Sequence, residues 1–236
     1  MLGAGALYFH LDPQQAVISD VNAQLIDCYL TIKEDVELLV EDLQTHVYES
    51  EYYYSIRNAD REPSFENWSR LKRSSRFIYL NRTCFNGLYR VNSKGQFNVP
   101  IGRYKNPNIC NVSNLRQVSA TLKDTDIINC SFTGIKESVG KNDFVYLDPP
   151  YAPLSATANF TSYTKEPFDN SMQIKLRDFC NELDSKGAYF LLSNSSAPLV
   201  YDLYKEHHIT EVSATRAINS SASKRGVVSE LLIRNY

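Results

Sequence analysis

The spacing of apolar residues divides the first part of the chain into a strand, a loop and a helical stretch. Residues 16–19 form a short β-prone run that ends at Asp20. In the stretch that follows, apolar residues recur three and four positions apart, which predicts the buried face of one long helix. The residues of this face are Leu25, Ile26, Tyr29, Ile32, Val36, Leu39, Val40 and Leu43.

The same alternation returns later in the chain. Residues 144–147 are a continuous apolar run, which is typical of a strand covered on both faces. Residues 171–186 have helical periodicity, with Gly187 placed to end the helix. Residues 188–193 and 228–233 predict two more strands. Strands that alternate with helices predict an α/β fold, in which a mostly parallel sheet carries helices on both faces and binds ligands at the carboxyl ends of its strands.

Residues 49–109 interrupt this pattern, because they are rich in Tyr, Arg and Asn and contain polar turns. The tetrapeptide Asn-Ser-Lys-Gly at 92–95 lies between two β-prone runs, and Gly95 can take a positive φ. This combination predicts a β-hairpin. We therefore expect a main domain formed by residues 1–48 and 110–236, with an inserted, mostly helical module at 49–109 that carries the hairpin.

The net charge of −2 hides an uneven distribution of charge along the chain. From Arg57 to Lys105 there are 11 Lys and Arg against 3 Asp and Glu, whereas the remainder carries 14 against 24. A basic segment inside an acidic chain suggests a face that binds a polyanion. On charge alone, a solvated helix surface explains the same residues equally well.

Composition excludes several classes of protein. With 236 residues, 43% apolar and 22% charged, the chain is neither disordered, nor collagen-like, nor a coiled coil. Its apolar runs fall short of the ~18 residues that cross a bilayer, and its start lacks the basic region of a secretory signal. The five cysteines form no CxxC pair, and the four histidines are not spaced as ligands. We therefore expect no metal site, no membrane association, reduced thiols and a cytoplasmic location.

The tetrad Asp148-Pro149-Pro150-Tyr151 directly follows the apolar run at 144–147. Two prolines fix the backbone, so a carboxylate and a phenol ring are held at set positions. An aromatic amine is a poor nucleophile because its lone pair is delocalised, but acceptors of its N–H bonds localise that lone pair and stabilise the charge that grows on nitrogen. Asp148 and the Pro149 carbonyl are such acceptors, and Tyr151 offers a face for stacking. An ordinary strand-to-turn signal is the alternative interpretation.

Several stretches together resemble the Dam-type, D12 class DNA adenine-N6 methyltransferases, over nearly the whole chain. Besides the tetrad they are Gly3–Phe9, Ser19–Asn22, Asn81–Asn92, Phe97–Pro100, Gly102–Pro107, Ala152–Ser155, Asn159–Tyr163 and Ser223–Tyr236. The resemblance implies a Rossmann-like sheet that uses S-adenosylmethionine, with residues 49–109 as the target-recognition module. It implies methyl transfer to N6 of adenine in duplex DNA, within GATC, after the base has been flipped out of the helix.

The resemblance assigns a role to individual residues. Catalysis falls to Asp148, Pro149 and Tyr151. Binding of S-adenosylmethionine falls to Gly3, Ala4, Gly5, Asp20, Ser131 and Asp148. Small residues suit a loop whose backbone approaches the cofactor, and Asp20 would bind the ribose hydroxyls, although it could also serve as a helix N-cap. Ser131 stands where the family usually has Asp. Phe160 and Tyr163 would close over the pocket, or else are core aromatics.

The resemblance also places DNA contacts on the basic module. Arg90 falls where the family reads guanine, which an arginine can contact at O6 and N7 in the major groove. Asn86, Leu88 and Pro100 fall at base-contacting or intercalating positions of the family, and Asn92 is also assigned to DNA. Arg103 and Lys105 resemble phosphate contacts. Arg70, Lys72, Arg73 and Arg76 are interpreted as solvated helix charges with some phosphate contact.

Besides Ser131, the start of the chain departs from the family pattern. The motif Lys-Trp-Ala-Gly-Gly-Lys and the Glu-Pro-Phe that usually precede the glycine loop are absent, so we expect the first strand and helix to be missing, in a shortened product or a fragment. An inactive DNA-binding remnant is the alternative function. An enzyme for RNA or for protein glutamine is less consistent, because the glutamine enzymes carry Asn at the position of Asp148. We expect a monomer that acts on double-stranded DNA, with a restriction endonuclease for the same site as a further partner.

Overall fold

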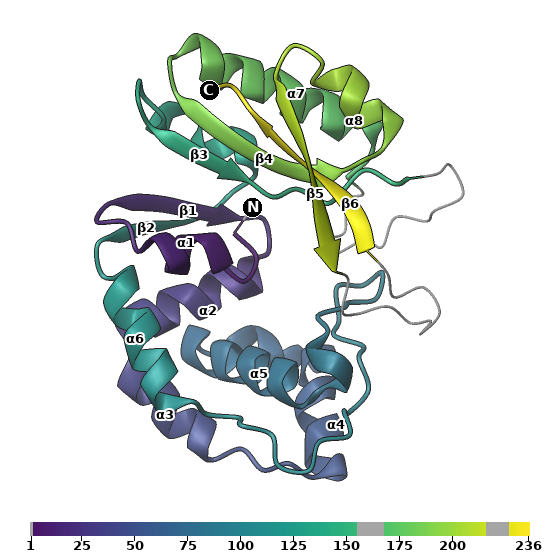
Figure 1. The fold of residues 1–236 in the computed structure, drawn as a ribbon. Coiled ribbons are helices and arrows are strands. Elements are labelled where there is room, and N and C mark those ends of the chain that lie inside the picture. The colour runs from purple at the N-terminus through teal and green to yellow at the C-terminus, as the bar shows by residue number, and fades with distance from the viewer. Residues whose placement is uncertain (1, 155–167, 216–226) are drawn as a thin grey trace. The chain divides into compact units, whose positions relative to one another are not determined.

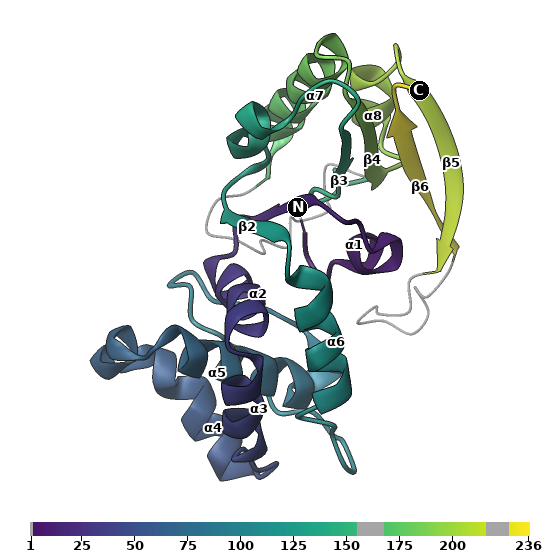
Figure 2. The same cartoon turned by 90° about the vertical axis from the view of Figure 1, so that its left-hand side faces the viewer.

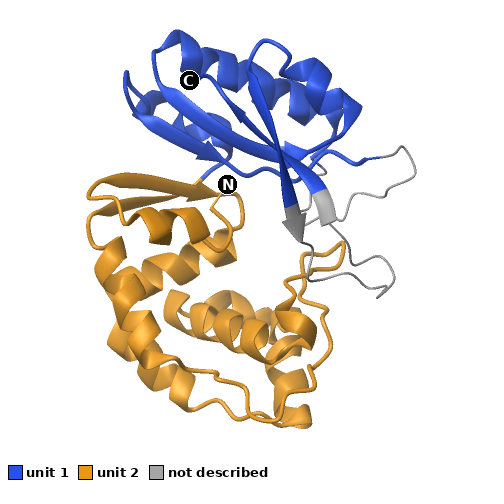
Figure 3. Ribbon diagram, in the orientation of Figure 1, with its two compact units in different colours: residues 1, 130–162, 166–236 blue, residues 2–129, 163–165 orange. Residues whose placement is uncertain are grey.

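The computed structural model describes residues 2–154, 168–215 and 227–236. Within these ranges the chain forms two compact units (Figure 3). Unit 2 contains residues 2–129, and unit 1 contains the described residues from Cys130 to Tyr236. The predicted recognition module at 49–109 lies entirely within unit 2.

Unit 2 is mainly helical and contains one pair of parallel strands, β1 and β2 (Figure 1). Ala16 lies opposite Thr125, and Asp20 lies opposite Asn129. The helices between the two strands form the crossover connection that a parallel pair requires. The elements in chain order are α1 (Ala6–Leu11), β1 (Ala16–Asp20), α2 (Ala23–Glu34), α3 (Val36–Gln44), α4 (Ser50–Asn58), η1 (Ala59–Arg61), η2 (Pro63–Asn67), α5 (Arg70–Thr83), η3 (Phe85–Gly87), α6 (Val112–Leu122) and β2 (Thr125–Asn129).

The single long helix predicted from residue 25 to residue 43 is in fact two helices, α2 and α3. Asp35 separates them with a φ of −134°, which is not helical. Apolar residues on both sides of the break, such as Ile32 and Leu39, belong to one buried cluster. The hydrophobic period therefore continues across the break, because it reports which side faces the core and not whether the backbone stays helical.

The predicted hairpin is present, with less strand structure than expected. Its two arms are joined by one antiparallel bridge, between Val91 and Phe97. The Gly95 N–H donates to the Asn92 carbonyl at 2.9 Å, and Gly95 has the predicted positive φ, +79°. Phe97 is buried against an aromatic cluster whose other members include Tyr53 of α4. One face of the hairpin is thus packed against this cluster.

Unit 1 is built on a four-stranded mixed sheet with the order β3-β4-β6-β5 (Figure 1). β3 and β4 are parallel, whereas β6 is antiparallel to both β4 and β5. The predicted mostly parallel sheet is therefore mixed in this unit. The elements in chain order are η4 (Phe132–Ser138), β3 (Phe144–Leu147), α7 (Asn170–Ser185), β4 (Tyr189–Ser195), α8 (Pro198–Leu203), β5 (His208–Thr215) and β6 (Val227–Arg234).

Helices α7 and α8 lie against the sheet of unit 1 (Figure 2). Val145 and Leu147 of β3 pack with Leu176 of α7 in one buried cluster. The alternate residues Phe144 and Tyr146 are 47% and 37% exposed. The prediction that this strand is covered on both faces is therefore wrong, because a continuous apolar run does not show which of its faces meets a helix.

The α/β class predicted from the alternation of elements is confirmed. The described strands form a two-stranded and a four-stranded sheet, so a single Rossmann-like sheet stays a prediction. In the part of the chain that the structure describes, no helix is long and apolar enough to cross a membrane.

Candidate functional site

The tetrad follows the end of β3, as the sequence predicts. Asp148 is exposed and Pro149 is buried. One carboxylate oxygen of Asp148, Oδ1, accepts a hydrogen bond from the Ser193 hydroxyl of β4 at 2.8 Å. An exposed acceptor is thus held in place by a side chain of the neighbouring strand.

Two buried amide side chains support the tetrad from below. Asn194 of β4 accepts a hydrogen bond from the Ala152 N–H at 3.0 Å and donates one to Gln173 of α7 at 3.1 Å. Gln173 in turn donates to the Pro150 carbonyl at 3.1 Å. Both amides are completely buried. Sequence reasoning missed them, although polar residues at the end of a buried strand were a usable signal.

The environment of Tyr151 raises the pKa of a phenol that is neutral at pH 7 in any case. Its hydroxyl donates to the Glu230 carboxylate of β6 at 3.2 Å. Burial, together with the negative charges of Asp148 and Glu230, raises the pKa of Tyr151 to about 12. Near neutral pH the tetrad therefore presents one carboxylate beside a neutral aromatic ring.

The glycine loop and Asp20 meet in unit 2. The two carboxylate oxygens of Asp20 accept hydrogen bonds from the Gly3 N–H at 3.1 Å and the Asn22 N–H at 2.9 Å. Gly5 has a φ of +66°, and a Cβ there would lie 2.9 Å from the Phe9 ring, so this position requires glycine. At Gly3, with a φ of +52°, a Cβ would meet nothing within 4 Å.

The N-cap of α2 is Asn22 and not Asp20. The Asn22 side chain accepts hydrogen bonds from the N–H groups of Gln24 and Leu25, at 3.1 and 3.3 Å. The alternative role of Asp20 as the helix cap is therefore wrong. Asp20 instead ties the glycine loop to the end of β1, and it is 7% exposed.

The other two residues assigned to the cofactor, Ser131 and Asp148, lie in unit 1. Ser131 precedes η4, and its hydroxyl is 2.8 Å from the Thr133 hydroxyl. The structure thus groups Gly3 with Asp20, and Asp148 with Tyr151. Phe160 and Tyr163 lie outside the described residues.

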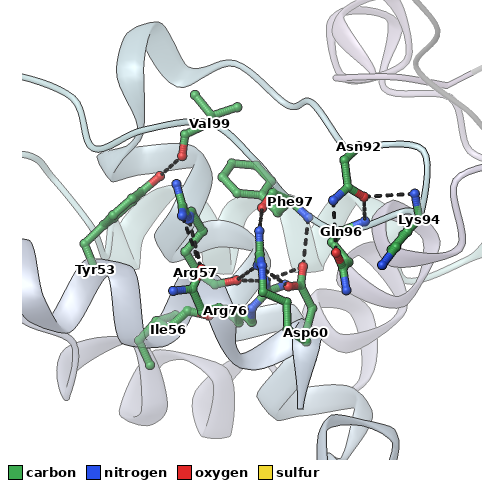
Figure 4. Close-up of polar contacts among 12 residues, drawn as sticks. Tyr53, Ile56, Arg57, Asp60, Arg76, Asn92, Lys94, Gln96, Phe97 and Val99 are labelled. Carbon is green, nitrogen blue, oxygen red and sulfur yellow. Dashed lines mark hydrogen bonds and ion pairs between the residues drawn. The ribbon is translucent and has the colours of Figure 1, made fainter. Parts of the chain in front are cut away.

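The residues assigned to DNA lie on the hairpin and on the loops beside it. Arg90 is exposed, and its Nε donates to Asn98 Oδ1 across the hairpin at 2.7 Å. Asn92 is engaged inside the turn: its Oδ1 accepts from the N–H groups of Lys94 and Gln96, both at 3.0 Å (Figure 4). Asn86, Pro100, Arg103 and Lys105 are exposed, and Leu88 is half-buried.

An exposed aromatic side chain that sequence reasoning missed lies beside Asn86. Phe85 is 48% exposed. Asn86 has a φ of +55°, which asparagine tolerates better than most residues. The loop is fixed from α5, where Asn81 donates to the Gly87 carbonyl at 2.8 Å. No pattern in the sequence indicated that this phenylalanine would be exposed.

The basic residues of α5 are largely paired within unit 2. Arg76 is not a solvated helix charge, because its side chain is 2% exposed and pairs with Asp60 at 2.7 Å. The remaining partners are Glu34 for Arg70, the Trp68 ring for Lys72 and Asp27 for Arg73. The excess of positive charge in the sequence therefore overstates what this helix offers to a polyanion.

Metal ligands and thiols are the other groups of this chain that could support chemistry. Among the described residues, no cluster of three His, Cys, Asp or Glu is arranged to hold a metal ion. Burial raises the pKa of Cys28 and Cys180 to about 12 and that of Cys84 to about 11. These three thiols are therefore protonated near neutral pH and are not nucleophiles.

Comparison with known proteins gives a match across almost the whole chain. The family model for D12 class N6 adenine-specific DNA methyltransferases matches residues 2–218. The type II methyltransferase M1.LlaDCHI of Lactococcus lactis is 46% identical over 239 residues, covering 100% of this chain and 84% of that protein. The type II methyltransferase M.MjaIII of Methanocaldococcus jannaschii is 43% identical over 250 residues, covering 100% and 86%. The DNA adenine methylase of Salmonella typhi is 33% identical over 238 residues, covering 98% and 83%. The chain therefore belongs to the family of D12 class N6 adenine-specific DNA methyltransferases.

Proposed function

We propose that this chain transfers a methyl group from S-adenosylmethionine to N6 of adenine in duplex DNA, within GATC, after flipping the adenine out of the helix. The observation that carries the proposal is the tetrad: an exposed carboxylate fixed by Ser193, beside a neutral Tyr151 ring. Flipping costs only about a few kcal/mol, which contacts to the extruded base can offset.

The tetrad acts by accepting hydrogen bonds from the target amine. Asp148 and the Pro149 carbonyl accept the two N–H bonds of N6, so the nitrogen lone pair is localised and turned away from the ring. The negative carboxylate stabilises the positive charge that develops on nitrogen during attack. Tyr151 stacks on the base, while its hydroxyl is held by Glu230. The buried amides below keep these groups in place, so little reorganisation is needed at the moment of reaction.

The residues assigned to S-adenosylmethionine fit that role within each unit. When bound, this molecule supplies an electrophilic methyl group on a sulfonium. Each carboxylate oxygen of Asp20 accepts one backbone hydrogen bond, from Gly3 or from Asn22, so each keeps acceptor capacity for ribose hydroxyls. The open space beside Gly3 allows close approach to the backbone, and Ala4 is also exposed. In unit 1 the residues that we assign to S-adenosylmethionine are Ser131 and Asp148.

The hairpin supplies sequence recognition in this proposal. Arg90 reads a guanine, Asn86, Leu88 and Pro100 lie near the bases, and the side chain of Asn92 shapes the turn that presents them. The exposed cations Arg103 and Lys105 contact phosphates, which adds affinity but little discrimination.

Replacing Asp148 tests the proposed mechanism. In Asp148→Ala we expect methyl transfer to fall by about 10²-fold or more, because the acceptor for the amine is lost, while binding of duplex DNA is retained. Asp202→Ala, at an exposed position of α8, is the matched control and should retain activity. Near-normal turnover in Asp148→Ala would remove the tetrad from the mechanism.

Calorimetry with S-adenosylmethionine separates this function from that of an inactive DNA-binding remnant. Saturable binding that weakens in Asp20→Ala supports the enzyme. Binding of DNA without any binding of S-adenosylmethionine supports the remnant.

We further propose that the chain acts as a monomer alongside a restriction endonuclease for the same site. Two relatives named type II methyltransferases, at 46% and 43% identity, support the pairing. Plasmid DNA from cells that express the chain should resist an endonuclease that methylation of GATC blocks. Full cleavage despite methylation elsewhere in the plasmid would exclude GATC as the target.

A further inference from the structure

Asp60, in the short helix η1, connects three segments of unit 2 that are distant in sequence (Figure 4). Its Oδ2 forms an ion pair with Arg76, at 2.7 Å from Nη2, and accepts a hydrogen bond from the Phe97 N–H at 2.8 Å. Its Oδ1 accepts from Arg61 Nη1 at 2.7 Å. The carboxylate is 5% exposed, so water contributes little to satisfying it.

Arg76 holds this carboxylate from α5. Its side chain is also bonded to the last turn of α4, because Nε donates to the Ile56 carbonyl at 2.8 Å and Nη2 to the Arg57 carbonyl at 2.7 Å. Carbonyls at the end of a helix have no partner inside the helix, and a buried guanidinium must have its donors satisfied. The pair is therefore fixed in position by two helices.

Side chains hold the hairpin arm at Phe97 through both of its backbone polar groups. The N–H is bound by Asp60, and the carbonyl accepts from Arg61 Nη2 at 3.0 Å. The bridge between Val91 and Phe97 is a non-hydrogen-bonded pair, because the bonds between the arms flank it, from the Asn92 N–H to the Gln96 carbonyl and from the Asn98 N–H to the Arg90 carbonyl. The N–H and carbonyl of Phe97 therefore point away from the other arm, and the side chains of Asp60 and Arg61 bind them instead.

Asn98, the next residue along this arm, connects Phe97 to Arg90 through two hydrogen bonds. Asn98 donates its N–H to the Arg90 carbonyl at 3.1 Å, and its side-chain oxygen accepts from Arg90 Nε at 2.7 Å. A displacement of Phe97 would move Asn98 and change the direction of the guanidinium. Bidentate contact with a base requires fixed geometry, so such a shift would weaken discrimination more than overall attraction to DNA.

We propose that Asp60, held by Arg76 and assisted by Arg61, is a positioning residue that sets the orientation of Arg90 and with it the discrimination between DNA sequences. The proposal rests on the proposed function of the hairpin. In this proposal Asp60, Arg61 and Arg76 orient Arg90 as well as stabilising the fold, and none of the three contacts DNA.

The experiment measures discrimination as a ratio of dissociation constants. The Kd for a duplex in which a single base pair of GATC is changed is divided by the Kd for the duplex containing GATC. Both are measured on the same preparation at the same salt, so the ratio does not depend on how much of the protein is folded. Asp60→Asn removes the buried charge, and Arg61→Ala frees the Phe97 carbonyl while it leaves the buried pair intact. Glu37→Gln, in an exposed pair with Arg116, is the matched control.

We expect the ratio to fall by about tenfold in Asp60→Asn and by less in Arg61→Ala, and to stay unchanged in Glu37→Gln. In an Arg90→Ala background, neither change should lower the ratio further, because they act through the same side chain. If Asp60→Asn does not fold, Arg61→Ala alone decides.

The possible failures can be told apart. If Arg90→Ala lowers the ratio but the folded Asp60 and Arg61 variants keep it, the inference is overturned and the proposed function stands. If Arg90→Ala itself leaves the ratio unchanged, the recognition role of the hairpin fails. A further fall in the double variants would show that Asp60 does not act through Arg90.

Discussion

The tetrad and the hairpin at 90–98 each present an exposed charged residue, Asp148 and Arg90, to which we assign a role, but the two residues are supported in different ways. Asp148 follows a strand within a four-stranded sheet, and neutral amides, Gln173 and Asn194, fix the loop behind it. Arg90 lies on a hairpin with a single bridge, which a buried carboxylate, Asp60, holds in place.

The difference suggests that reaction and recognition can be disrupted separately. The tetrad depends on backbone geometry and on amides that are satisfied without charge. The hairpin depends on the buried ion pair of Asp60 and Arg76, and removing one partner of such a pair leaves an uncompensated charge. Substitutions in each support should therefore affect different measured quantities.

The largest effect on stability is expected from Asn194→Ala, beneath the tetrad. The change leaves the Ala152 N–H and the Gln173 side-chain oxygen buried without their partner, at about 1–3 kcal/mol for each group. Denaturant unfolding should show a loss of that size. Asn108→Ala, at an exposed position, should change stability by about 0.5 kcal/mol or less. Equal losses in the two variants would show that the amides do not support the loop.

A comparison of Arg90→Ala with Arg103→Ala tests whether Arg90 contacts a base and Arg103 a phosphate, as we propose. Loss of Arg90 should reduce discrimination at one base pair by about 1–3 kcal/mol, and loss of Arg103 should weaken binding to all duplexes alike and lower the salt slope by about 1. Titrations of duplex variants at several salt concentrations measure both effects. The assignment is reversed if Arg103→Ala changes the sequence preference and Arg90→Ala changes only the salt slope.

A smaller effect is expected from Tyr53→Phe, below the hairpin. The lost hydroxyl donates to the Val99 carbonyl at 2.9 Å, and a neutral hydrogen bond of this kind contributes about 1 kcal/mol. Thermal unfolding should register the loss, while the ratio of dissociation constants stays close to that of the unchanged chain. Tyr54→Phe removes a hydroxyl that bonds to none of the described residues and is the control. A large fall in discrimination in Tyr53→Phe would show that Asp60 is not the residue that mainly fixes the position of the hairpin.

The smallest expected effect is on the pH dependence of the stability of unit 2. His46 is buried between Tyr52 and Ser75, and burial lowers its pKa, with Asp42 opposing. The unfolded chain therefore binds more protons, so stability should fall as pH drops below about 6.5. His46→Gln should make this slope shallower in denaturant unfolding between about pH 5 and pH 7.

The exposed His10→Gln is the control for this measurement. A pH slope that is unchanged in His46→Gln would assign the acid sensitivity to another group. His207, whose pKa burial also lowers, is the next to be tested.

Local patterns predicted the elements that depend on local properties. β1, β3 and α7 were predicted almost to their ends, because apolar spacing and a glycine cap are written in consecutive residues. The break between α2 and α3 at Asp35 was not predicted, because one non-helical φ leaves the hydrophobic period intact. The tetrad was singled out because its residue types dictate what it can accept and stack upon.

The sequence by itself determined the class of fold, the family and the chemical groups that the chain can offer. Only the tertiary structure decided which charges are available. Arg76 and Arg90 have the same side chain, yet Arg76 is buried against Asp60 while Arg90 is exposed on the hairpin. A side chain carries its charge in its covalent structure, but the partners that neutralise or orient that charge come from segments distant in sequence, and folding alone brings them together.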